Sequence, residues 1–338
     1  MAGRSPVAAY DSGMELRVLG GTGLTVSRIG LGLAAVGRPA YIDLGRAEDL
    51  GGARSVDALR QRAHELLDAA LDLGIGYVDV ARSYGLAEEF LGSWLEGLPA
   101  DAARPVVGSK WGYTYVGDWR MDATVHEVKD HSLGAFRRQL GESRAILGEH
   151  LALYQVHSAT LESGILDDPA VLGALSRLRD DGIAVGLTVS GPRQADVVRR
   201  ALDIRVDGRN PFGCVQATWN LLEPAAGDAL GEAHAAGWGV IVKEALANGR
   251  LAVRGAVPPL LAAASERRGV GADAVAIAAA LAQPWADVVL SGAVTVDQLV
   301  SNSGAAEIAL DPAELAGFAA VAQPSEAYWA TRSRLAWS

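Results

Sequence analysis

Four side chains that could do acid–base chemistry stand at or just beyond the ends of apolar runs: Asp79, Tyr84, Lys110 and His157. Reduction of a carbonyl by hydride needs a proton donor at the oxygen, where negative charge develops. A free tyrosine is a weak acid with a pKa of about 10, and a nearby ammonium lowers that pKa. We therefore expect Lys110 to activate Tyr84 and Asp79 to keep Lys110 charged. His157 would orient the substrate oxygen.

These runs belong to a chain-wide alternation of strand and helix patterns. Residues 14–27 carry the pattern of a hairpin with a Gly-rich turn. The predicted strands that follow are residues 29–35, 77–81, 105–110, 151–157, 183–190, 214–219, 239–243 and 287–291. Apolar stripes at helical spacing predict helices over residues 56–73, 87–98, 131–147, 169–180, 193–202, 226–236, 258–268, 272–283, 296–303 and 312–322. Irregular loops are expected over residues 37–55 and 113–124.

Strand–helix units with short connections predict an α/β fold, a (β/α)8 TIM barrel with an N-terminal β-hairpin and extra C-terminal helices. We expect this single domain to cover residues 14–338, after a disordered leader at residues 1–13. Chemistry in such barrels lies at the carboxyl ends of the strands. The strand-end residues expected round one mouth are Asp79, Lys110, His157, Ser190, Gln216, Lys243 and Ser291.

The composition argues against several classes of protein. A net charge of −10 disfavours binding to nucleic acid or to anionic membranes, and no apolar run approaches the roughly 18 residues of a membrane span. Cys214 is the only cysteine, so no intrachain disulfide can form and a cytoplasmic location is expected. Histidines and carboxylates show no metal-ligand spacing, so no metal site is predicted.

Lysine is rare in this chain. Of the 30 basic residues only Lys110, Lys129 and Lys243 are lysines. A compact ammonium can enter a buried site where a guanidinium would not fit. A lysine at a strand end is therefore a candidate for a specific role, with biased codon usage as the alternative.

The four residues at the ends of successive predicted strands resemble the catalytic tetrad of the aldo-keto reductases. The resemblance extends from about Leu16 to Asn302. It implies a barrel that is an NAD(P)-dependent aldo-keto reductase or alcohol dehydrogenase, acting on a small-molecule carbonyl or alcohol such as an aldehyde, ketone or sugar. Tyr84 would be the general acid/base, with Asp79, Lys110 and His157 as the other catalytic residues. A monomer is compatible with this interpretation.

The resemblance also implies a nicotinamide cofactor held at the strand ends. The segment Gly30-Leu31-Gly32-Leu33-Ala34-Ala35 satisfies a relaxed Rossmann pattern, but no helical stripe begins until after residue 55, and the Rossmann pattern requires a helix there. We expect this segment instead to be the first barrel strand beneath the nicotinamide. The implied cofactor residues are Gly32, Leu33, Ala34, Asp79, Ser190, Gly191, Gln216, Lys243, Glu244, Leu246, Asn248, Gly249, Arg250, Ser291, Gly292, Gln298 and Asn302.

Two departures from the family pattern concern this cofactor site. Lys243 stands where many members have an aromatic residue that stacks on the nicotinamide. Gly292 and Gln298 stand where many members have basic residues for the 2′-phosphate of NADP. Loss of charge-assisted hydrogen bonds weakens the case for that phosphate, although Arg250 or Arg193 could compensate. Family habit favours NADP, with NAD possible.

The substrate pocket is expected to lie among loops. Trp111, directly after Lys110, is the predicted wall, together with His157. Weaker candidates for the wall are Tyr113, Tyr115, Trp119, Trp329 and Trp337. Two other functions stay open: a nucleotide-binding, redox-sensing module on the same barrel, and a lyase or isomerase that uses Lys110 as a Schiff base.

Overall fold

The computed structural model describes residues 13–252 and 255–337. Its centre is a closed barrel with the strand order β10-β11-β12-β3-β4-β5-β8-β9, in which neighbouring strands are parallel. The barrel strands are β3 (Ile29–Gly32), β4 (Tyr77–Asp79), β5 (Val106–Trp111), β8 (Leu151–Ala159), β9 (Ala184–Val189), β10 (Cys214–Thr218), β11 (Gly239–Lys243) and β12 (Val288–Ser291). The predicted (β/α)8 architecture is confirmed.

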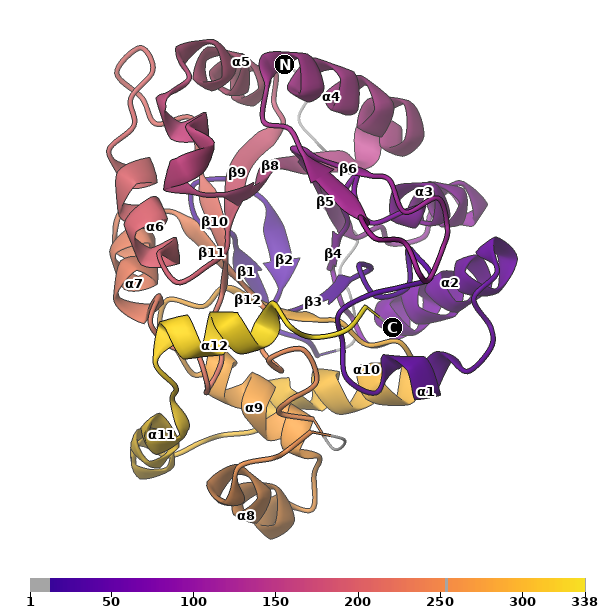
Figure 1. Ribbon diagram of the computed structural model, residues 1–338, viewed down its shortest axis with the longest axis vertical. Coiled ribbons are helices and arrows are strands. Elements are labelled where there is room, and N and C mark those ends of the chain that lie inside the picture. Colours follow the sequence, from indigo (N-terminus) through magenta and orange to yellow (C-terminus); the bar gives the residue numbers. More distant parts are fainter. Residues whose placement is uncertain (1–12, 253–254, 338) are drawn as a thin grey trace.

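Helices alternate with the strands along the chain and surround the barrel (Figure 1). They are α2 (Val56–Asp72), α3 (Ala87–Gly97), α4 (Leu133–Leu147), α5 (Pro169–Asp180), α6 (Gln194–Leu202), α7 (Gly227–Ala235), α8 (Pro259–Arg268), α9 (Ala272–Leu281), α10 (Val296–Ser303) and α11 (Pro312–Phe318). Helices α5 and α10 have the predicted bounds because their starts are strongly marked. Asp168 caps α5 before a proline, and Thr295 caps α10.

The predicted hairpin closes the amino-terminal end of the barrel. Strand β1 (Leu16–Val18) pairs antiparallel with β2 (Thr25–Ser27), and Leu19 packs in a cluster with side chains inside the barrel, among them Tyr77 and Ile241. The turn must contain glycine because a Cβ on Gly20 would lie 2.0 Å from the backbone nitrogen of Gly239. The hairpin thus keeps this end shut, and the barrel opens at the other end.

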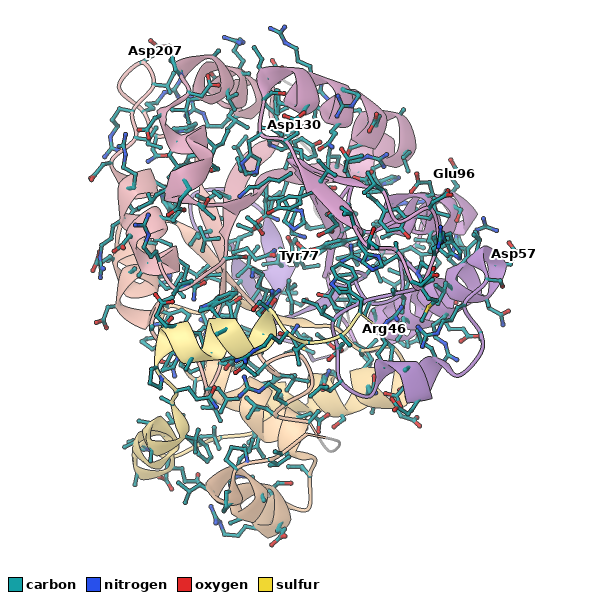
Figure 2. All side chains as sticks on the ribbon, viewed as in Figure 1. Arg46, Asp57, Tyr77, Glu96, Asp130 and Asp207 are labelled. Atoms are coloured by element: carbon teal, nitrogen blue, oxygen red, sulfur yellow. The ribbon has the colours of Figure 1, made fainter. Side chains whose placement is uncertain are left out.

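Side chains fill the barrel, as Figure 2 shows for Tyr77, which lies at its centre, whereas Asp57, Glu96 and Asp207 lie on the outer surface. Tyr77 is fully buried. The interior is therefore a packed core rather than a pore, as is usual for this fold. The side chains of this core pack between the hairpin and the carboxyl ends of the strands.

The sequence patterns did not predict four short elements. Helix α1 (Arg46–Leu50) lies in the expected loop over residues 37–55, strands β6 (Tyr113–Tyr115) and β7 (Glu127–Lys129) form a hairpin across the second expected loop, and α12 (Ser325–Arg332) follows α11. They are too short to show a period. The predicted leader, apart from Gly13, lies outside the described residues.

Candidate active site

A cavity of about 610 Å³ opens at the carboxyl ends of the strands. The ends of β3, β4, β8, β10, β11 and β12 contribute to its wall through Gly32, Asp79, His157, Gln216, Lys243 and Ser291. The loop that contains α1 and the residues around α12 complete the wall. The chemistry-bearing strand ends therefore meet round one mouth.

Asp79 and Lys110 form a buried ion pair at the floor of this cavity. Their side chains are 3% and 0% exposed. Lys110 Nζ donates hydrogen bonds to Asp79 Oδ1 and, at 2.9 Å, to the carbonyl of Val80. Asp79 Oδ2 accepts from the Tyr77 hydroxyl at 3.1 Å and from Gln216 Nε2 at 2.9 Å. Burial lowers the pKa of Lys110, and the charge on Asp79 opposes that shift.

Tyr84 lines the cavity above this pair. Its ring centroid lies 4.6 Å from Lys110 Nζ and 5.5 Å from the centroid of His157, at right angles to that ring. Burial raises the pKa of Tyr84 well above its usual value, the charge on Asp79 raises it further, and the Arg38 guanidinium acts in the opposite direction. The phenol is therefore protonated at neutral pH, as a proton donor must be.

The net shift of the Tyr84 pKa is therefore upward, whereas the sequence predicted a lowered value. The ammonium is compensated by the carboxylate of Asp79, so the pair presents little net charge to the phenol. Burial then dominates, because desolvation disfavours the phenolate. Lys110 stabilises the phenolate form and so opposes the rise, but burial and the charge on Asp79 outweigh this effect, and the phenol stays protonated.

His157 completes the group as a neutral ring. Burial lowers its pKa well below the usual value, and the positive charges of Lys110 and Lys243 lower it further. Its Nδ1 lies 3.4 Å from the Ser83 hydroxyl. The ring lines the cavity and, being uncharged, can donate one hydrogen bond to an oxygen placed beside Tyr84.

Most of the predicted cofactor residues line the cavity. They are Gly32, Ala34, Asp79, Ser190, Gln216, Lys243, Glu244, Leu246, Asn248, Gly249, Ser291, Gly292, Gln298 and Asn302. Leu33, Gly191 and Arg250 are not part of its wall. Leu33 belongs to the hydrophobic core, and Arg250 lies over the ring of Tyr328 and donates to Gln323.

Trp111 does not line the cavity either, so the structure corrects the predicted substrate wall. Its ring is fully buried and packs against Phe136 and His131, with centroids 5.0 and 5.8 Å away. Neighbouring side chains within a strand point to opposite faces, so Trp111, the last residue of β5, faces the helix layer when Lys110 faces the barrel. The aromatic part of the wall comes instead from Tyr41, Tyr84, Tyr113 and Trp337.

Arg38 is a site residue that sequence reasoning missed. It is 2% exposed, lines the cavity and forms an ion pair with Glu127 at 2.7 Å. Its guanidinium lies 5.4 Å from the ring centroid of Tyr84 and 4.9 Å from that of Trp337. The signal was weak, because this arginine stands in an aperiodic segment that contains glycine and proline.

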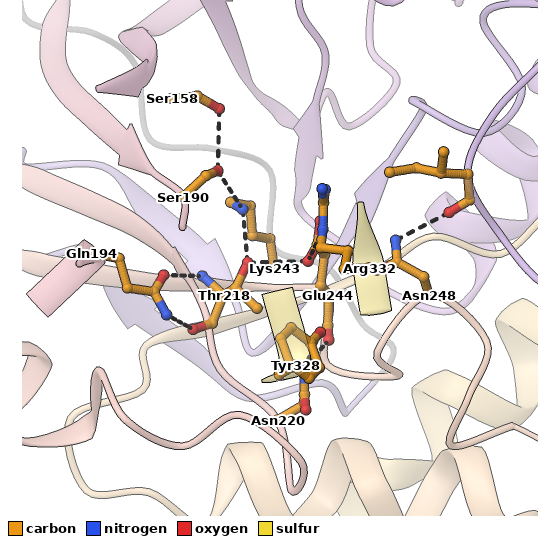
Figure 3. A network of polar contacts seen from close by, with 11 residues as sticks. Ser158, Ser190, Gln194, Thr218, Asn220, Lys243, Glu244, Asn248, Tyr328 and Arg332 are labelled. Carbon is orange, nitrogen blue, oxygen red and sulfur yellow. Dashed lines mark hydrogen bonds and ion pairs between the residues drawn. The ribbon is translucent and has the colours of Figure 1, made fainter. Parts of the chain in front are cut away.

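A polar network joins the end of β11 to α12, which lies across the barrel beside it (Figures 1 and 3). Arg332 holds Glu244 with hydrogen bonds from Nε at 3.0 and 2.9 Å and another from Nη2. Asn220 donates to the backbone of Glu244 and to the hydroxyl of Tyr328. Glu244 has a left-handed backbone (φ 55°), a conformation that persists only where surrounding contacts impose it.

The ion pair between Glu244 and Arg332 makes the anchoring of α12 dependent on pH. The Arg332 and Lys243 charges lower the pKa of Glu244 to about 2 against the opposing effect of burial. The pKa of Glu244 in the folded state lies below the usual 4.5, so its ionised form stabilises the folded protein by about 3 kcal/mol. This contribution to the free energy of unfolding is fully present above pH 4.5 and is lost as the pH falls toward 2. We expect the backbone amides of α12 to exchange hydrogen faster at pH 3 than at pH 6, after correction for intrinsic rates. In Glu244→Gln this pH effect should vanish; an equal effect in both proteins would contradict the assignment.

Comparison with known proteins gives the family. Residues 50–323 match the model of the aldo/keto reductase family, and the chain belongs to that family. Its fold is shared with an aldo-keto reductase from Bacillus halodurans in its holo form, at a TM-score of 0.69 and 23% identity, over 92% of this chain and 97% of the other.

Two curated relatives match over part of the chain. The oxidoreductase YqkF of Bacillus subtilis is 25% identical over 173 residues, 50% of this chain and 46% of the relative. A pyridoxal 4-dehydrogenase of Microbacterium luteolum is 30% identical over 164 residues, 42% of this chain and 43% of the relative. The matched stretches span less than half of either relative.

Two further findings concern the described residues only. They contain no group of three or more histidine, cysteine or acidic side chains that could hold a metal ion. They also contain no helix that is both long and apolar enough to cross a membrane.

Proposed function

We propose that this chain is a nicotinamide-dependent oxidoreductase that transfers hydride between the cofactor and a small carbonyl or alcohol. The observation that carries the proposal is the convergence of Tyr84, His157 and the Asp79–Lys110 pair on one cavity. Membership of the aldo/keto reductase family supports it.

The cavity suits a dinucleotide because, at the end formed by α10 and the loop after β11, buried polar atoms have no hydrogen-bond partner in the protein. Asn302 is 2% exposed and donates to Ser291 at 2.8 Å, while its Oδ1 has no partner. Asn248 donates to the carbonyl of Ile42, and its Oδ1 is also without a partner. Buried polar atoms are normally hydrogen-bonded, so both oxygens are placed to accept from a bound ligand such as an adenosine.

The proposed reaction depends on Tyr84 as the group that carries the proton for the substrate oxygen. A bound nicotinamide would supply or accept the hydride. In the direction of reduction the carbonyl carbon gains that hydride and the carbonyl oxygen takes the proton of Tyr84. Lys110 stabilises the resulting phenolate until solvent returns a proton, and Asp79 keeps Lys110 charged. His157 donates a hydrogen bond to the reacting oxygen. Oxidation of an alcohol runs through the same groups in reverse.

The buried position of Lys110 argues against the alternative function, a lyase or isomerase in which Lys110 forms a Schiff base with the substrate. Its side chain is 0% exposed and is held by Asp79 and Val80, and it is not part of the cavity wall. A lysine nucleophile must reach the substrate as a free amine. The same burial fits a role in holding charge beside Tyr84.

Charge at the far end of the cavity favours NAD over the NADP that family habit implied. Gln298, at a position where many relatives have a basic residue, donates to Asp49 Oδ2 at 2.7 Å. Asp49 lines this end, as does Asp43, whose pKa burial raises to about 7 so that it is only partly charged at neutral pH. A carboxylate accepts a hydrogen bond from a ribose 2′-hydroxyl, whereas it repels a 2′-phosphate. Arg46 lines the same end but donates from Nε, Nη1 and Nη2 to backbone carbonyls.

Titration with NADH and NADPH tests this proposal directly. We expect NADH to bind about tenfold or more tightly than NADPH, and Asp49→Asn to narrow that difference by removing the repelling charge. Steady turnover should then follow with a panel of aldehydes, ketones and sugars. Pyridoxal belongs in the panel because a relative is a pyridoxal 4-dehydrogenase. Binding without repeated turnover would favour the redox-sensing module, and failure to bind either nucleotide would contradict both functions.

A further inference from the structure

Lys243, at the end of β11, is a cation whose direct partners are uncharged. Its Nζ donates to the hydroxyls of Thr218 at 2.8 Å and Ser190 at 3.2 Å (Figure 3). Within the part of the chain that the structure describes, no carboxylate lies within 4.0 Å of this nitrogen. The nearby carboxylate of Glu244 is engaged by Arg332 in a two-pronged ion pair.

Three other cations beside the cavity have a carboxylate partner each. Lys110 pairs with Asp79, Arg332 with Glu244, and Arg38 with Glu127. These pairs contribute little net charge to the space between them. Lys243 therefore supplies a net positive charge to the end of the cavity where the chemistry takes place.

The charge of Lys243 acts electrostatically on the residues of the proposed reaction, as the pKa of His157 shows. It is one of the causes that lower the pKa of His157. In turn the charges of Lys110 and Asp79, on β5 and β4, act on Lys243 itself, as do Glu244 and Arg332. Ser190 and Gln216, at the ends of the two strands before β11, line the cavity beside it. A ring placed for hydride transfer next to Tyr84 and His157 thus lies within the field of this ammonium.

We propose that Lys243 makes the site bind the reduced nicotinamide more tightly than the oxidised one and thereby favours oxidation of an alcohol on the enzyme. This inference rests on the proposed function. The oxidised ring carries a positive charge and the reduced ring carries none, so an ammonium without a paired carboxylate repels only the former.

The direction of the reaction follows by linkage. In the oxidation, the alcohol carbon loses a hydride, that is two electrons and a proton, to the nicotinamide, and the hydroxyl proton passes through Tyr84 to solvent. The equilibrium constant of this step on the enzyme exceeds that in solution by the ratio of the dissociation constants of the oxidised and reduced cofactors. A tenfold ratio corresponds to about 30 mV for this two-electron couple.

The size of the effect has an upper limit that depends on pH. Burial lowers the pKa of Lys243 to about 8, with Glu244 opposing and Arg332 and Lys110 reinforcing the shift. The lysine can escape repulsion by releasing its proton, which limits the discrimination to about tenfold at pH 7 and about a hundredfold at pH 6. His157 stays neutral across this range because its own pKa is lowered well below the usual value.

The experiment measures dissociation constants of NAD⁺ and NADH at pH 6 for the wild type, Lys243→Gln and Lys243→Met. The glutamine retains a hydrogen-bond donor and the methionine does not, so agreement between them isolates the charge. We expect the ratio of the NAD⁺ to the NADH constant to fall about tenfold or more in both variants. Lys129→Gln is the matched control: it removes an exposed lysine at the rim, where solvent screens the charge, and should change the ratio less than twofold.

A ratio that stays within twofold of the wild type in Lys243→Gln and Lys243→Met would overturn the inference while leaving the proposed function standing. Failure of the wild type to bind either nucleotide would overturn the function itself. The wild type also provides a test that needs no variant. Its ratio should decline between pH 6 and pH 9 as Lys243 loses its proton, and a ratio independent of pH would contradict the role of this charge.

Discussion

Tyr84→Phe is expected to lower turnover by roughly 10²- to 10⁴-fold, the range for loss of a positioned general acid. The substitution removes the phenol proton beside His157 and the Asp79–Lys110 pair. The ring itself stays in place, so the dissociation constant of NADH should change less than twofold. Steady-state rates with the best substrate, together with nucleotide titration, measure the two effects separately.

The control for this variant is Tyr154→Phe. Tyr154 is fully buried and is not part of the cavity wall. Its hydroxyl interacts with Ser143, and loss of one such neutral hydrogen bond costs about 1 kcal/mol, so the rate should stay near that of the wild type. Near-full turnover by Tyr84→Phe would remove Tyr84 from the mechanism.

Asp79→Asn should have the largest effect on stability. It leaves Lys110 fully buried without a counter-charge, and loss of one member of a buried pair costs about 3–5 kcal/mol. It also weakens the acceptor for Tyr77 and Gln216. Denaturation by urea should show a lower midpoint, and turnover should fall because Lys110 is then more readily neutral.

The double variant Asp79→Asn with Lys110→Met separates charge from packing. Replacement of both members of a buried pair is often close to neutral, so part of the lost stability should return while turnover stays low. If the single variant Asp79→Asn unfolds within 1 kcal/mol of the wild type, the pair is not the buried salt bridge described above.

The sequence was sufficient for the barrel because each strand–helix unit has a strong local signal. Strand β11 and helices α5 and α10 have the predicted bounds, since apolar runs and caps mark their ends. It was insufficient for α1, the β6–β7 hairpin and α12, whose three to eight residues are held by tertiary contacts. The anchor of α12, the ion pair between Arg332 and Glu244, joins residues 88 positions apart.

The site shows the same difference between features set by local sequence signals and features set by tertiary contacts. Strand ends place Asp79 and His157 on the wall of one cavity, with Lys110 buried beside them and paired with Asp79, which follows from barrel geometry once the strands are known. The balance of charges does not follow, because it depends on Arg38 and on the closeness of Asp79 to Lys110. For that reason the sequence predicted the partners of Tyr84 and missed the direction of its pKa shift.

The scarcity of lysine turns the mouth of the barrel into the target of amine chemistry. Lys110, Lys129 and Lys243 are the only side-chain amines in the chain, and all three lie at the open end of the barrel, on β5, β7 and β11. Of these amines Lys129 is exposed, whereas Lys110 is fully buried. A reagent that acylates side-chain amines would therefore modify this end of the barrel and spare the arginine-rich outer surface. Coupling through side-chain amines to a solid support would turn the opening toward the support, so immobilisation calls for another attachment chemistry.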